Sequence, residues 1–136
     1  MAAQGPTIHP SIRYRDAHAA VDFLQRAFGF EIVMSVPGPD GTIAHAELRY
    51  GDGMIMLGSE PEGCDPRYGV HASHSWCYVV VDDTDAHHDR AKAAGAQIIR
   101  ELEDTDYRSR DYSARDPEGN VWSVGTSRPS LEPAPG

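Results

Sequence analysis

The first half of the chain combines one helical pattern with four strand patterns. Apolar and polar positions alternate over residues 8–14, which predicts a strand with one buried face. Apolar residues then recur at helical spacing between Asp16, a favourable N-cap, and Gly29, a residue that ends helices. Three further extended stretches follow, separated by glycine-containing turns: 30–36, 42–50 and 54–58. We therefore predict a β-α-β-β-β unit over residues 8–58.

The stretch 42–50 has two distinct rows of side chains, because successive residues of a strand point to opposite faces. One row is apolar and is expected to cover the helix: Ala44, Ala46, Leu48 and Tyr50. The other row is expected to face away from it: Ile43, His45, Glu47 and Arg49.

The second half repeats the same order of elements over residues 74–126. Residues 76–82 are apolar nearly throughout, which is typical of a strand covered on both faces. A helix is expected from Asp82 or Asp83 to Ala94, where Gly95 ends it. Three more strands are expected: 96–101, 110–115 and 121–125. The turn between the last two is Asp116-Pro117-Glu118-Gly119, which makes them a hairpin.

An internal repeat relates the two halves. Helix caps, helix face, strand and final turn all recur 66 positions later: Asp16 and Asp82, Ala20 and Ala86, Ala27 and Ala93, Gly29 and Gly95, Ile32 and Ile98, Gly53 and Gly119. A constant offset indicates a duplicated unit, and two such units side by side would leave a concave sheet surface. Residues 59–73, which contain several Pro and Gly, are expected to link the units, and residues 127–136 to form a disordered tail.

Composition narrows the class of protein. A chain of 136 residues suits a single domain with a real core, and its 40% hydrophobic content is ordinary for globular proteins. The net charge of −9 argues against nucleic acid. It mildly favours a cationic ligand through long-range steering, although an acidic surface that keeps the protein soluble is the simpler interpretation. We expect no membrane span and no signal peptide. The two cysteines are too few for a disulfide scaffold, so a cytoplasmic protein is expected.

Several motifs together resemble the vicinal oxygen chelate superfamily, the glyoxalase/bleomycin resistance/dioxygenase fold. The first half carries the resemblance in IHPSIRYRDAHAAVDFLQRAFGFEIV, and the second in VVVDDTDAHHDRAKAAGAQII and RDPEGNVWSVG. The resemblance implies an α+β fold in which two βαβββ modules form a curved mixed sheet around a cavity, usually in a homodimer. It spans residues 8–126 as one domain.

The resemblance also implies where a divalent metal would sit in the metal-using members. Their four His, Gln or Glu ligands lie on the first and fourth strands of each module. Here the first position holds His9 and the second holds Met56 or Leu57, which do not suit a hard ion. The third holds Ser75, which a one-residue bulge could replace with His74, and the fourth holds Ser123 in place of Glu. Glu47 could complete a set with His9 and with either His45 or His74.

Aromatic and polar side chains supply the other candidate ligand contacts. Aromatic rings with a polar tip suit small-molecule pockets. The candidates are Trp76, Tyr107, Arg110, Tyr112 and Trp122, and the charged loop 104–111 is expected to rim the cavity. For Trp76, Trp122 and Tyr112, a core position is the simpler interpretation. Cys77 is expected to be inert core, and the His87-His88 pair to be exposed on its helix.

The leading hypothesis is a small-molecule binding protein that works without a metal and sequesters an antibiotic-like aromatic or cationic ligand. Its expected ligand contacts are His9, His45, Glu47, Met56, Trp76, Tyr107, Arg110, Tyr112, Trp122 and Ser123. One alternative is a metal-dependent enzyme, either a glyoxalase-like lyase or an extradiol dioxygenase, that uses His9, His74 and Glu47. Another is a metal-free acid–base catalyst in which His9, His45 or Glu47 handles a proton.

Overall fold

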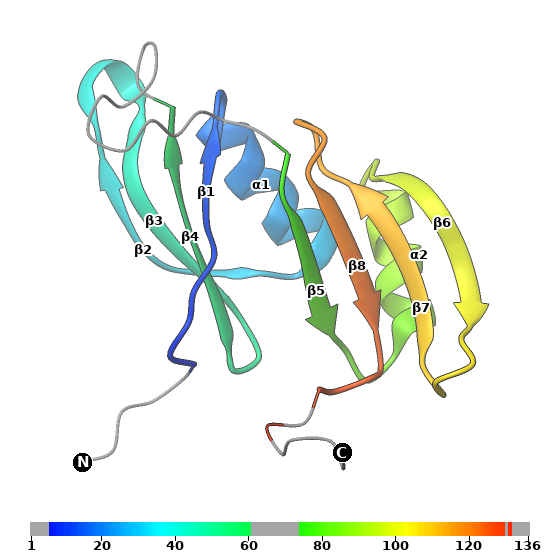
Figure 1. Cartoon of the computed structure of the whole chain (residues 1–136). Helices are drawn as coiled ribbons and strands as arrows, with labels where there is room; N and C mark the ends of the chain where they lie inside the picture. The colour runs from blue at the N-terminus through cyan, green and yellow to red at the C-terminus, as the bar shows by residue number, and fades with distance from the viewer. Residues whose placement is uncertain (1–5, 61–73, 130, 132–136) are drawn as a thin grey trace.

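Two modules with the same order of elements make up the molecule (Figure 1). The computed structural model describes residues 6–60, 74–129 and 131. The first module consists of β1 (Ser11–Tyr14), α1 (Ala17–Phe28), β2 (Glu31–Pro37), a short 3-10 turn η1 (Pro39–Gly41), β3 (Ile43–Tyr50) and β4 (Gly53–Ser59). The second consists of β5 (Trp76–Val80), α2 (Thr84–Ala93), β6 (Gln97–Asp104), β7 (Arg110–Arg115) and β8 (Val121–Gly125). The predicted pair of βαβββ modules is confirmed.

The helix ends follow from local chemistry. The Asp16 carboxylate accepts a hydrogen bond from the Ala19 N–H, and Gly29 ends α1 in the left-handed conformation at φ 81°. In the second module, Asp83 is the N-cap and accepts from the Ala86 N–H. The repeat therefore places a carboxylate cap at the start of each helix. The cap of α2, Asp83, lies one residue later than the constant offset predicts.

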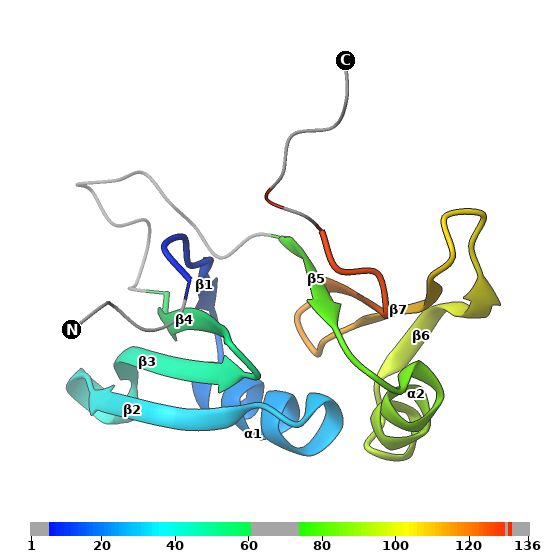
Figure 2. The ribbon, with the colours of Figure 1, turned by 90° about the horizontal axis from the view of Figure 1, so that it is seen from below.

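Each module has its own four-stranded mixed sheet. The strand orders are β1-β4-β3-β2 and β5-β8-β7-β6, with β1 and β5 parallel to their neighbours and the other pairs antiparallel. Figure 2 shows both helices on the same side of the two sheets. The helices also contact each other, and no other helix or strand of the described residues covers the opposite face of either sheet. No helix in the described part of the chain is long and apolar enough to cross a membrane.

A single core joins the modules between the helices and the covered sheet faces. Its largest fully buried side chains come from both halves and include Tyr14, Phe28, Tyr112 and Trp122. Phe30 of the first module meets the edge of Trp122 of the second, with ring centroids 5.6 Å apart. The predicted linker at 61–73 and most of the predicted tail lie outside the described residues.

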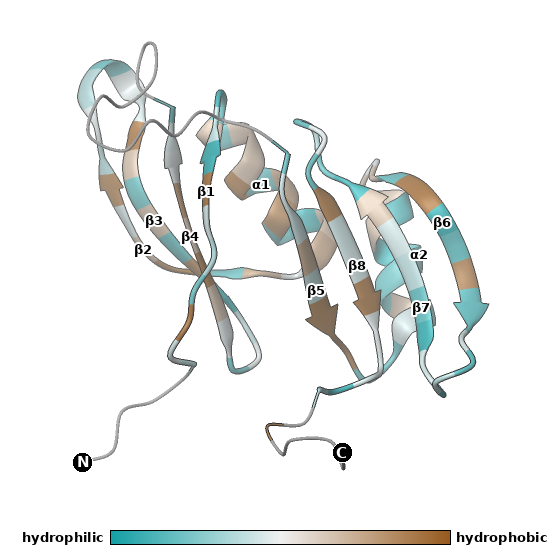
Figure 3. Ribbon diagram, in the orientation of Figure 1, coloured by the Kyte–Doolittle hydropathy of each residue, from teal (hydrophilic) through white to brown (hydrophobic). Residues whose placement is uncertain are grey.

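The apolar strand β5 is not covered on both faces, contrary to the sequence-based expectation. It lies at the edge of its sheet, and β8 is its one partner among the described strands. Cys77 and Val79 pack against the core, whereas Trp76 is 76% exposed and Tyr78 is also exposed. Figure 3 shows how apolar β5 is along its length. The apolar run of β5 therefore has one face that packs in the core and a second face whose aromatic side chains are exposed to solvent.

The expectation that His87 and His88 are exposed is wrong. Both are buried, at 7% and 6% exposure. The His87 ring lies between the modules, where Nδ1 is 2.7 Å from the Tyr112 hydroxyl and Nε2 is 3.0 Å from the Phe28 carbonyl oxygen. His88 bridges Asp89 and Glu101. Their helix packs against α1 and β7, so its polar residues enter the interface.

The two predicted rows of β3 hold only in its second half. Ala46 and Leu48 are buried as expected, but Ile43 is buried and Ala44 is exposed. A bulge in the pairing with β2 explains the exchange, because Val36 pairs with His45 and Pro37 pairs with Ile43, which skips Ala44.

Candidate ligand-binding site

The uncovered face of the second sheet carries Trp76 hydrogen-bonded to Ser123. Strands β5 and β8 are parallel neighbours, and the Trp76 indole N–H donates to the Ser123 hydroxyl oxygen at 2.9 Å. The Ser113 hydroxyl of β7 lies 2.8 Å from the same oxygen. Ser123 is only 7% exposed, while the ring that covers it is largely open to solvent. The site therefore offers a flat aromatic surface above a pair of hydroxyl groups.

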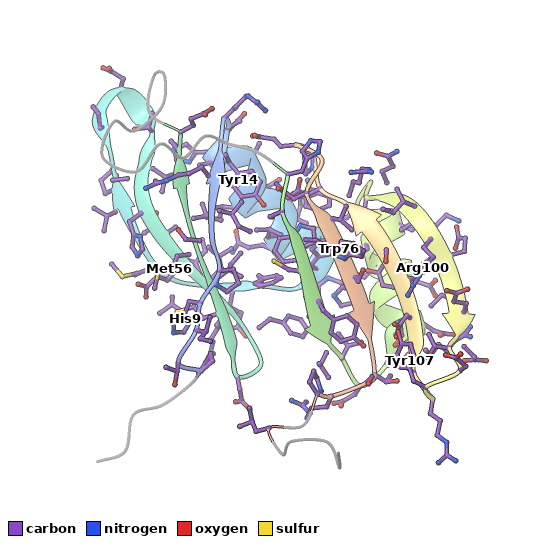
Figure 4. The ribbon with its side chains drawn as sticks, viewed as in Figure 1. His9, Tyr14, Met56, Trp76, Arg100 and Tyr107 are labelled. Atoms are coloured by element: carbon purple, nitrogen blue, oxygen red, sulfur yellow. The ribbon has the colours of Figure 1, made fainter. Side chains whose placement is uncertain are left out.

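A buried carboxylate, Asp111, lies at the centre of a second cluster on this face. Its side chain accepts hydrogen bonds from the Tyr107 hydroxyl at 2.8 Å and from the Ser109 hydroxyl. The Arg100 guanidinium lies 3.3 Å from the same carboxylate, and the Tyr78 hydroxyl lies 3.4 Å from that of Ser109. Figure 4 shows Trp76, Arg100 and Tyr107 over the second sheet. Buried carboxylates need such partners, so Asp111 holds three neighbouring side chains in place, and Tyr78 joins the cluster through Ser109.

The hydrogen bond from Tyr107 to Asp111 also affects the acidity of the phenol. Together with some loss of solvent, it raises the pKa of Tyr107 above its ordinary value of 10.0. Tyr107 therefore remains a neutral hydrogen-bond donor at physiological pH, with its exposed ring available for contact with a ligand.

The uncovered face of the first sheet brings together other predicted residues. His9 precedes β1, and the backbone of Pro10 beside it accepts a hydrogen bond from the Met56 N–H of β4 at 2.9 Å. Figure 4 shows His9 and Met56 near each other. On β3, the His45 Nε2 and a Glu47 carboxylate oxygen are 3.0 Å apart. This face thus combines a thioether, two imidazoles and a carboxylate.

Three of the predicted ligand contacts face elsewhere. Tyr112 and Trp122 are fully buried on the helix side of their strands, because the alternation that places Ser123 on the opposite face turns both of them inward. Arg110 forms ion pairs with Asp85 at 2.6 Å and Asp104 at 3.2 Å, so it ties the start of β7 to α2 and β6. We therefore remove these three residues from the uncovered-face site.

The sequence reasoning missed Arg100 and Ser113, and it included Asp111 only as part of the charged loop at the rim. A usable signal was present, since the turn at 116–119 sets the hairpin register and pairs Ser113 with Ser123. Asp111 lies two residues before Ser113 and shares its face. Arg100 could not be found in this way, because two register shifts interrupt the pairing of β6 with β7.

A family model matches this architecture over most of the chain. The Glyoxalase/Bleomycin resistance protein/Dioxygenase superfamily model covers residues 7–124. The chain belongs to this superfamily. An uncharacterised protein of Mycobacterium bovis is 34% identical over 125 residues, which are 88% of this chain and 82% of that protein.

Solved structures agree with this membership of the glyoxalase/bleomycin resistance superfamily. TioX from Micromonospora sp. ML1 is 35% identical and has a TM-score of 0.77, over 89% of this chain and 98% of that one. A bleomycin-binding protein solved with bleomycin has a TM-score of 0.65 at 24% identity, over 90% of this chain and 99% of its own. At 24% identity, the similarity to the bleomycin-binding protein shows a shared fold and no more.

The residues at the positions implied for a metal in this superfamily do not fit a hard divalent ion. Met56 offers a thioether, and Ser123 offers a hydroxyl already engaged by Trp76 and Ser113. His74 lies near the start of β8, where its ring faces Gly119. Within residues 6–60, 74–129 and 131, no three His, Cys, Asp or Glu side chains are grouped so as to hold a metal ion. The predicted set of His9, His74 and Glu47 is therefore not assembled in this structure.

Proposed function

We propose that this protein binds an aromatic, cationic small molecule on its uncovered sheet faces and needs no metal to do so. The observation that carries the proposal is the hydrogen bond between Trp76 and Ser123. It places an indole ring over the position where a metal-using member of the superfamily would have a carboxylate. An indole face suits flat and cationic ligands, because both stacking and cation–π attraction act on it.

The charge of the chain supports a cationic ligand. A net charge of −9 attracts cations at long range, and two exposed rings, Trp76 and Tyr107, offer surfaces on which a cation can rest. The structural neighbour that was solved with bleomycin supports the same class of activity. We infer that sequestering such a compound, rather than transforming it, is the role of the site, and we expect this to occur in the cytoplasm.

The same proposal includes a homodimer. Each module leaves one sheet face uncovered, with apolar side chains exposed on it. A second copy could set its first sheet opposite the second sheet of its partner, so that the ligand is enclosed from both sides. The contacts would then be His9, His45, Glu47 and Met56 from one copy, and Trp76, Tyr107 and Ser123 from the other.

Calorimetric titration with bleomycin and with the aromatic cation thioflavin T tests the proposal. We expect saturable binding that survives exhaustive treatment with a chelator. Trp76→Ala should weaken it about tenfold, whereas Trp76→Phe, which retains a ring, should weaken it less. Leu131→Ala is the matched control, since Leu131 is fully exposed and lies outside both sheets. Binding that requires a stoichiometric metal ion, or that is indifferent to Trp76→Ala, would contradict the proposal.

Metal-free acid–base catalysis is a second candidate function, favoured by the 3.0 Å contact between His45 and Glu47 on an uncovered face. A carboxylate that orients an imidazole is a common arrangement for proton transfer. The measurement is turnover of a candidate substrate in the presence of chelator. Activity that disappears in His45→Ala and persists in His18→Ala would support this candidate.

A further inference from the structure

A cavity of about 370 Å³ lies between the two modules and is distinct from the Trp76–Ser123 site. Its walls come from the segment before β1, the hairpin between β3 and β4, strand β5 and the segment after β8. None of Trp76, Ser113, Ser123 and Asp111 lines it, and Tyr78 marks its border with the uncovered face of the second sheet. Its volume falls within the range of small-molecule pockets.

The interior of the cavity is apolar and partly aromatic. Phe30 and Trp122, whose rings meet edge to face, belong to its lining, together with the side chains of Ile8, Ile55 and Val79. Burial raises the pKa of the neighbouring Cys77 thiol, so that this side chain also stays uncharged. Apolar surface exceeds polar surface in the lining, which also includes Tyr50 and Tyr78, so a flat and mostly apolar molecule suits the space.

Two charged side chains, Arg128 and Asp52, lie at the cavity. Both are exposed, and neither forms an ion pair or hydrogen bond with another residue in the described part of the chain. By contrast, Arg26, Arg49 and Arg110 each form an ion pair with a carboxylate. An unpaired guanidinium beside an apolar cavity is well suited to a carboxylate or sulfonate, which it can bind with two parallel hydrogen bonds.

We propose that this cavity is a second binding site, which takes a flat apolar molecule carrying a single carboxylate or sulfonate. The rings would rest against Ile8 and Val79, and the acidic group would pair with Arg128. Asp52 limits the ligand to one negative charge, because it would repel a dianion. The site uses residues of both modules, so its occupant also holds the modules together.

A pair of matched dyes tests the proposal. The dye 8-anilinonaphthalene-1-sulfonate is a flat apolar monoanion, and N-phenyl-1-naphthylamine is nearly the same molecule without the sulfonate. The chain has two tryptophans, so in the Trp76→Phe variant only Trp122 can transfer excitation energy to a dye bound in the cavity. We expect saturable energy transfer with one sulfonate dye per chain, and tighter binding of the sulfonate than of the neutral dye.

Arg128→Gln, made in the Trp76→Phe background, identifies the site. Arg128 is exposed, so this change should leave the fold intact, and we expect it to weaken the sulfonate dye about fivefold. The neutral dye should bind both variants equally. Lys92→Gln, which removes an exposed positive charge on α2 away from the cavity, is the control and should change neither dye. The proposal is overturned if Trp122 transfers no energy, or if Arg128→Gln and Lys92→Gln weaken the sulfonate dye equally. Arg128 and Lys92 both lie outside the uncovered-face site, so a loss confined to Arg128→Gln is assigned to the cavity and not to that site.

Discussion

The hydroxyl of Tyr14, in the first module, donates a hydrogen bond of 2.6 Å to the carboxylate of Asp116, in the second. Asp116 also accepts from the Trp122 indole N–H at 3.2 Å and from the Asn120 side chain at 3.1 Å. Burial and the neighbouring carboxylate raise the pKa of Tyr14 far above its ordinary value of 10.0, so that it stays a donor. One carboxylate in the final turn thus joins the first strand to the last.

Removing the Tyr14 hydroxyl should therefore destabilise the whole chain. We expect Tyr14→Phe to lower the free energy of unfolding by about 1–2 kcal/mol, because a buried charged acceptor loses a partner. Equilibrium unfolding in urea measures the change. Tyr50→Phe is the matched control, since the Tyr50 hydroxyl makes no hydrogen bond with the described residues, and it should stay within about 0.5 kcal/mol of the wild type. Equal losses in the two variants would contradict the role assigned to the Asp116 bond.

Stability should decrease in acid because of His87. Burial, reinforced by the nearby Arg90 guanidinium, lowers the pKa of His87 below its ordinary value of 6.5, although the hydrogen bond to the Phe28 carbonyl opposes this shift. The unfolded chain therefore binds a proton at a higher pH than the folded one. The contribution of His87 is fully present above pH 6.5 and is lost as the pH falls from there through the folded-state pKa.

Unfolding free energies measured between neutral and mildly acidic pH check this prediction. In His87→Gln, the fall in stability over this range should be smaller than in the wild type by at most about 1.4 kcal/mol per pH unit. The slope is compared rather than the absolute value, since the substitution also removes packing. Identical slopes in wild type and His87→Gln would show that another group is responsible.

Gly125 leaves room for the Asp111 cluster. A Cβ built at Gly125 would overlap the Asp111 carboxylate and lie 2.5 Å from the Tyr78 hydroxyl. Gly125→Ala should displace these groups and cost about 1–3 kcal/mol of stability. Gly53→Ala is the matched control, because a Cβ there meets only the Tyr50 carbonyl oxygen, at 3.4 Å. The midpoint of thermal unfolding should be lower for Gly125→Ala than for Gly53→Ala. Ligand binding at the uncovered face of the second sheet should weaken only in Gly125→Ala.

Metal ions should leave the folded protein unchanged. Because Ser123 is engaged by Trp76 and Met56 offers only sulfur, we expect neither a rise in the thermal midpoint with Zn²⁺, Ni²⁺ or Mn²⁺ nor a fall after dialysis against chelator. Differential scanning calorimetry of the untagged protein makes the measurement. A midpoint that rises with the concentration of one of these ions, and that loses this response in His9→Ala, would argue for a metal centre.

The local elements could be predicted because each is encoded by neighbouring residues. Asp16 caps the first helix, Gly29 ends it, and the hairpin 110–115 and 121–125 has the predicted bounds. Short-range sterics and hydrogen bonds decide these features, and the repeat doubled the evidence for them. Membership of the superfamily follows from the same patterns, since they recur in a fixed order along the chain.

The surroundings of the polar and aromatic side chains could not be predicted in the same way. His87 is buried because α2 meets α1, and Trp76 is exposed because β5 has a neighbour on one side only. Arg100 contacts Asp111 because two register shifts interrupt the pairing of β6 with β7, and no local sequence pattern predicts these shifts. Residue type and alternation along the sequence determined the strands, the helices and their two faces. Which of those faces is covered, and therefore where a ligand can bind, depends on contacts between segments far apart in the chain, and only the tertiary structure decided it.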